Sequence, residues 1–166
     1  SKDNPVAEEA IALISPRARA ALVQANENGG LTEELKRFLF PLACEWFASL
    51  YSAIQAEKHG VEVKLKVTDH LPFLSAVTFR TGTQKQDRVE GSGRTGFYLG
   101  PSDEVPGGSL ILTLKSDVDI SEDEPETAVA KAGSKVVVAT TVRRQLNDGK
   151  LIYPKKGEVS VPSVPW

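Results

Sequence analysis

The stretch of sequence from residue 32 to residue 54, TEELKRFLFPLACEWFASLYSAI, shows the clearest periodic pattern in the chain. Its large apolar side chains recur at steps of three and four residues, the spacing of one face of an α-helix: Leu35, Phe38, Leu39, Leu42, Trp46, Leu50 and Ile54. Thr32 is a good N-cap and His59-Gly60 is a typical stop, so we predict one long helix between them. Pro41 lacks a backbone N–H, and we therefore expect this helix to kink or restart there.

Two shorter helices are predicted upstream of the long one. Asn4-Pro5 and Ser15-Pro16 each place a capping side chain before a proline at the first helical position. The first helix is expected to end near residue 14. The second is expected to start at Ser15-Pro16 and to stop at Asn28-Gly29-Gly30. The N-terminal third of the chain should therefore be helical.

Residues 61–68, VEVKLKVT, alternate strictly between apolar and polar side chains, and this period of two predicts a strand with one buried face. Glycine and proline punctuate the rest of the chain. Further strands are predicted between them, at residues 74–80, 96–99, 109–115, 127–131, 135–144, 151–153 and 158–161. The sequence LNDGK at 146–150 predicts a hairpin turn, because Asn, Asp and Gly tolerate positive φ, and the strands on either side of it should be antiparallel neighbours.

These elements predict one α+β domain covering residues 1–166, with a helical part at 1–60 and a β-rich part at 61–166. N-terminal helices at about 5–58 are expected to pack on a mainly antiparallel β-sheet or sandwich at about 61–162. A chain of 166 residues has the usual size of one domain with one core. The glycine-rich stretch 82–95 and the acidic stretch 116–126 are expected to be long exposed loops.

Side chains that carry catalysis or hold metals are scarce. The chain has two histidines and one cysteine, and it lacks the Cys-x-x-Cys, His-x-His and His-Glu-x-x-His spacings. The acidic run from Asp117 lacks the glycine of a calcium loop, and GSGRTG at 91–96 is not followed by the helix that dinucleotide binding requires. We expect no catalytic residue, no metal and no cofactor. If the protein is an enzyme, Asp69 and His70 form the best acid–base pair.

The single cysteine and the lack of long apolar runs indicate the compartment. Cys44 has no partner for an internal disulfide, and it lies in the most apolar helical stretch, where burial disfavours a reactive thiolate. No run of 18 apolar residues occurs. We expect a cytoplasmic protein, or one assembled in a virion, with no membrane partner.

Charge is segregated in the β-rich part, although the net charge of the chain is only -2. Residues 116–126 hold six acidic side chains and no basic one. Basic side chains gather on either side of this stretch: Arg80, Lys85, Arg88, Arg94, Arg143, Arg144, Lys155 and Lys156. They could follow a phosphate backbone while exposed Phe97, Tyr98 or Tyr153 stack on bases, which is how single-strand binders work.

The leading hypothesis is a non-catalytic interaction or self-assembly protein, of the kind found among viral or phage structural components. Such a chain forms homo-oligomers, and we expect Trp46, Tyr51 and Trp166 to lie at the interface. The alternative is a single-stranded nucleic-acid-binding protein that uses the basic β surface. The second alternative is an enzyme that uses Asp69 and His70.

Overall fold

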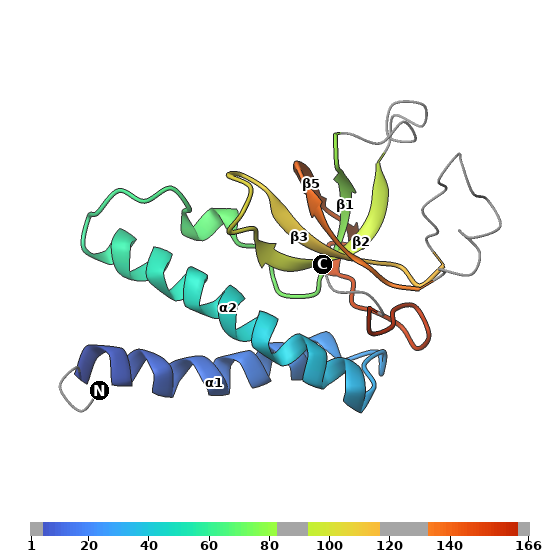
Figure 1. The fold of residues 1–166 in the computed structure, drawn as a ribbon, viewed down its shortest axis with the longest axis horizontal. Helices are drawn as coiled ribbons and strands as arrows, with labels where there is room; N and C mark the ends of the chain where they lie inside the picture. The colour runs from blue at the N-terminus through green and yellow to red at the C-terminus, as the bar shows by residue number, and fades with distance from the viewer. Residues whose placement is uncertain (1–4, 83–92, 117–132, 163–166) are drawn as a thin grey trace.

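The computed structural model describes residues 5–82, 93–116 and 133–162, with side chains described from residue 12 onward. Within these residues two long helices come first, and a five-stranded antiparallel sheet and a two-stranded hairpin follow (Figure 1). The helices pack side by side, and the second lies between the first and the sheet. This arrangement confirms the predicted α+β class.

Helix α1 (Pro5–Ala25) is continuous, so the predicted break at Ser15-Pro16 is wrong. A proline removes one hydrogen bond and crowds the preceding turn, but Pro16 is exposed and its ring faces solvent rather than a packed neighbour. Ala18, Leu22 and Ala25 are buried on the other side of the helix, against α2. Packing of this small-residue face offsets the lost hydrogen bond and carries the helix through the proline.

Helix α2 (Glu33–Lys58) begins and ends where the sequence predicts. The Leu35 N–H donates to Thr32 Oγ1 at 3.1 Å, which satisfies one of the free amides of the first turn. At the other end the His59 N–H donates to the Gln55 carbonyl, and Gly60 adopts φ +68°. The helix continues through Pro41, which is exposed, and does not restart there.

The main sheet is formed by β1 (Ala76–Arg80), β2 (Arg94–Pro101), β3 (Ser109–Thr113), β4 (Val136–Ala139) and β5 (Thr141–Arg144), in the order β4-β3-β2-β1-β5. The predicted single strand 135–144 is therefore two strands, at opposite edges of the sheet. Thr140 alone separates them, and its N–H and hydroxyl both donate to the Arg80 carbonyl, at 2.8 and 3.2 Å. Because consecutive residues form both edges, the sheet must curl on itself (Figure 1).

The curl gives the sheet an inner and an outer apolar face. Five buried residues fill the inside: Val77, Phe79, Tyr98, Ile111 and Ala139. The outer face packs on the helices through Ala76, Phe97, Leu99 and Leu112. Inside the curl a Cβ at Gly96 would lie 2.4 Å from Ile111 Cγ2, so only glycine fits this strand position.

The short hairpin β6 (Leu146–Asn147) and β7 (Lys150–Leu151) confirms the predicted turn. Asp148 and Gly149 have φ +51° and +76°, the conformation of a type I′ turn. The strand predicted at 158–161 is absent. Ser160 and Ser134 instead exchange two bonds, in each of which a backbone N–H donates to the other serine hydroxyl. The strand predicted at 127–131 lies outside the described residues, as do most of the two predicted loops.

Trp46 joins the helices to both faces of the sheet. Its Nε1–H donates to the Leu71 carbonyl at 2.8 Å, its ring lies 5.8 Å from that of Phe73, and it packs against both apolar clusters.

We expect Trp46→Ala to lower the free energy of unfolding by about 3 kcal/mol, measured by denaturant melts. Val23→Ala, at a side chain that is 74% exposed, should change it by less than about 0.5 kcal/mol. A loss below about 1 kcal/mol for Trp46→Ala would contradict this role.

Burial raises the pKa of Tyr98 to about 12, and the negative charge of Asp69 adds to the shift, while a backbone hydrogen bond at Leu71 opposes it. Since the unfolded phenol titrates near 10.0, its proton is lost first from the unfolded chain. Stability should therefore be complete below pH 10 and fall as the pH rises toward 12. Urea melts at about pH 9 and pH 11 should show a smaller loss for Tyr98→Phe than for the parent chain. An equal loss in both would refute the assignment, and Tyr51→Phe serves as the control.

Candidate functional site

Residues 61–68, for which the sequence predicts a strand most clearly, do not form one in the structure. The 61–68 segment is irregular, bends at Lys64-Leu65 and leads into a 3-10 helix, η1 (Val67–Asp69). Val61 and Val63 are 59% and 42% exposed. Alternating sequence predicts one buried face, but a strand also needs a neighbour to pair with, and no described strand borders this segment. The apolar face that the pattern predicts is therefore only partly covered, because Leu65 and Val67 are half-buried while the two valines are exposed.

Both ends of the 61–68 segment are tied to the body of the protein. At its start the Val61 N–H donates to the Ala56 carbonyl at 2.8 Å. At its end the Lys66 N–H donates to Asp69 Oδ2 at 2.8 Å, and the Lys66 carbonyl lies 2.9 Å from His70 Nδ1. The segment therefore forms a bridge of defined ends across one side of α2.

The middle of the bridge makes no such contacts. Among the described residues, none forms a backbone hydrogen bond with residues 62–65. Residues 62–64 are exposed and Leu65 is half-buried. An extended stretch with free backbone groups is the chemical equivalent of a sheet edge.

Hollows flank the bridge on both sides. One of about 740 Å³ lies between the bridge and the end of α2, and it is lined by Ala53, Glu57, Val61 and Val63. Another of about 500 Å³ lies between the bridge, the middle of α2 and the end of β2, where Leu65 and Leu99 contribute. The bridge therefore lies over partly apolar surface without filling the space beside it.

The structure separates the predicted acid–base pair. The Asp69 carboxylate caps the Lys66 N–H, while His70 Nε2 lies 2.7 Å from Ser49 Oγ on α2. Because the Lys66 carbonyl can only accept, Nδ1 carries the proton when the imidazole is neutral, and Nε2 of that tautomer accepts from the serine hydroxyl. No local pattern pointed to Ser49, which is 21 residues away from His70.

A serine beside a held imidazole is one part of a nucleophilic site. Such a site also needs free N–H donors for the oxyanion. Ser49 lies inside α2, where backbone amides are used by the helix itself. We interpret the pair as the tie that holds the C-terminal end of the bridge on α2.

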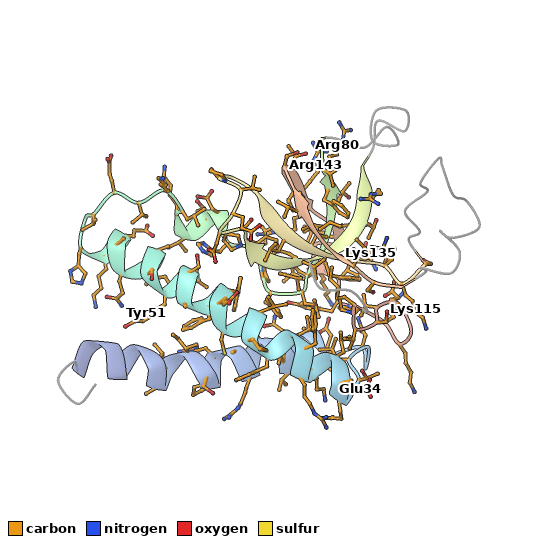
Figure 2. The ribbon with its side chains drawn as sticks, viewed as in Figure 1. Glu34, Tyr51, Arg80, Lys115, Lys135 and Arg143 are labelled. Atoms are coloured by element: carbon orange, nitrogen blue, oxygen red, sulfur yellow. The ribbon has the colours of Figure 1, made fainter. Side chains whose placement is uncertain are left out.

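The predicted basic residues do not form one surface. Arg80 and Arg143 are exposed diagonal neighbours on the outer face, since Arg80 pairs with Thr141 and Arg143 with Thr78, and Figure 2 shows both at one end of the sheet. Arg144 alternates to the other face, and the Arg94 guanidinium lies over the Phe79 ring, 4.9 Å from its centroid.

The remaining predicted basic residues lie elsewhere. Lys155 and Lys156 are exposed in a separate loop, where Lys155 forms an isolated antiparallel β-pair with Gly29 near the helix corner. Lys85 and Arg88 lie outside the described residues.

The prediction that exposed aromatic rings stack on bases is wrong. Phe97 and Tyr98 are each 1% exposed and Tyr153 is 3% exposed, and all three belong to the core. Stacking on a nucleobase requires an accessible ring face. The curl of the sheet buries both faces of β2, which the short stretch FYL could not reveal.

The predicted interface residues lie in different environments. Trp46 is half-buried at the junction described above. Tyr51, labelled on α2 in Figure 2, is also half-buried, with its ring 6.1 Å from that of Phe47. Trp166 lies outside the described residues. An interface at these positions stays a prediction.

Metal and thiol chemistry find little support in the described part of the chain. None of its His, Cys, Asp and Glu side chains gather in a group of three or more that could hold a metal ion. Burial raises the pKa of Cys44, which opposes formation of a thiolate. Neither described helix combines the length and apolar character required to cross a membrane.

No protein-family model, no curated protein and no solved structure matches this chain.

The Ser49–His70 tie can be measured by a double-mutant cycle. We expect Ser49→Ala and His70→Ala each to destabilise the fold, and the double variant to show a coupling of about 1 kcal/mol, the net contribution of one hydrogen bond. Denaturant melts of the four proteins give this value. Ser52→Ala, one turn further along α2, should show no coupling with His70→Ala. Additive effects at positions 49 and 70 would contradict the tie.

Proposed function

We propose that this chain is a non-catalytic protein that assembles with copies of itself. The observation that carries the proposal is the bridge, where exposed Val61 and Val63 lie next to backbone groups that no described residue bonds. Exposed apolar surface beside unpaired amides and carbonyls is unfavourable in a monomer, and such surfaces are typical of sites where another chain binds. A protein that assembles through this surface gains from covering it.

The charge of the bridge supports a protein partner more than a nucleic acid. Glu62, Lys64 and Lys66 alternate with the apolar residues, so acidic and basic groups are mixed at close spacing. A phosphate backbone favours uniformly basic surface, because each neutralised phosphate contributes to affinity. Mixed charges favour a complementary protein surface.

A single-stranded nucleic-acid binder remains the second candidate, for one specific reason. Arg80 and Arg143 are exposed neighbours that could hold one phosphate between them. Burial of the three aromatic rings removes the stacking that this candidate function would otherwise use. The second candidate therefore has an electrostatic contact but no described base platform.

Light scattering after size exclusion separates the two candidates. We expect the purified chain at low salt to give a mass that is a multiple of 17.9 kDa and that rises with concentration, with an absorbance ratio typical of protein alone. Arg80→Gln with Arg143→Gln should leave this mass unchanged. A monomer at every concentration would refute assembly. Co-eluting nucleic acid that leaves as salt rises, and is reduced in the double variant, would favour the second candidate.

A further inference from the structure

We propose that the bridge is a self-complementary strand: residues 61–65 of two copies pair in antiparallel orientation around a twofold axis at Val63. This inference rests on the proposed self-assembly and names its surface. Four observations carry it, namely the free backbone groups, the order of charges, the exposed valines and the position of the bridge in the fold.

The hydrogen bonds already made leave only one edge of the bridge free. In an extended strand the backbone groups of alternate residues point to the same edge. The Val61 N–H is bonded to Ala56, which places residues 61, 63 and 65 along the edge facing the protein. Glu62 and Lys64 then present their amides and carbonyls to the outside, and no described residue bonds to either backbone.

The charges select one register from those that use this edge. Pairing Glu62 with Glu62 of the second copy, or Lys64 with Lys64, would set like charges directly opposite each other, which is destabilising. Pairing Glu62 with Lys64 sets opposite charges together, and the twofold axis repeats the contact. This register exchanges four hydrogen bonds between the copies.

The same register brings the apolar residues together. Val63 meets Val63 of the second copy at the axis, and Val61 meets Leu65 on each side. Val61 and Val63 are the two most exposed large apolar residues of the bridge, so pairing covers surface that the monomer leaves in water. Charged and apolar pairs then occupy opposite faces of the new ladder, as the alternation of the sequence predicts.

The position of the bridge leaves room for a second copy. It follows the C-terminal end of α2, and Figure 1 shows it at the left of the view, away from the labelled strands of the sheet. Its ends are tied, so ordering it in the dimer costs less conformational entropy than ordering a free tail. The bend at Lys64-Leu65 straightens on pairing.

A charge-reversal cycle tests the register. We expect Glu62→Lys and Lys64→Glu each to weaken dimerisation by roughly tenfold, because each variant creates two like-charge pairs. The double variant Glu62→Lys with Lys64→Glu should restore the parent value to within about threefold, since it swaps the charges but keeps them paired. Sedimentation velocity over a range of concentrations measures the association. The control Glu27→Lys makes the same change in net charge at an exposed position near the helix corner.

Amide hydrogen exchange provides an independent measurement on the parent chain. The amides of Glu62 and Lys64 should exchange more slowly as protein concentration rises, and the amide of Val63 should not. The proposal is supported if the double variant restores dimerisation and if protection of the amides alternates along residues 62–64 in this way. Two outcomes would overturn pairing through the bridge and leave self-assembly intact. One is an oligomer whose mass is unaffected by all three bridge variants. The other is weaker association in the single variants that the double variant does not restore. A parent chain that is monomeric throughout would overturn both.

Discussion

The main sheet closes around Thr140, and this closure determines how the other parts of the chain pack. One residue turns the chain from one edge of the sheet to the other, and it does so by directing two donors at the Arg80 carbonyl. Closure creates an interior that only apolar side chains and one glycine can fill. The outer apolar face of the sheet packs on α2, which α1 supports from the other side. The bridge connects the helices to the sheet, and no strand among the described residues pairs with it.

The helices and the sheet act as one body because a few side chains connect them at several levels. Trp46 contacts both apolar clusters and holds the backbone at Leu71. Ser49, one turn further along α2, holds His70 and with it the end of the bridge. A single helix face thus packs the core and sets the position of the candidate interface. Assembly through the bridge would therefore need no rearrangement of the core.

Local patterns predicted the elements whose causes are local. The periodicity of α2, the Thr32 cap and the turn at Asp148-Gly149 depend on residues within a few positions of one another, and all three are as predicted. The predicted break at Pro16 is wrong because packing of α1 on α2 outweighs the hydrogen bond that the proline removes. The split at Thr140, the burial of β2 on both faces and the Ser49–His70 contact depend on residues far apart in the chain. The alternation at 61–68 predicted a strand that does not form, because no described strand borders this segment and a local pattern does not show whether a pairing neighbour is present.

The sheet closure also indicates the order in which the chain folds. The two helices are joined by a short corner, and their contacts form between residues that are near in sequence. Thr140 and Arg80 are 60 positions apart, so their contact requires closing a large loop before it stabilises anything. We therefore expect the helical pair and the β1–β2–β3 meander to form early and the β1–β5 pairing to form last. Until that final step, the newly made chain exposes the interior of its sheet.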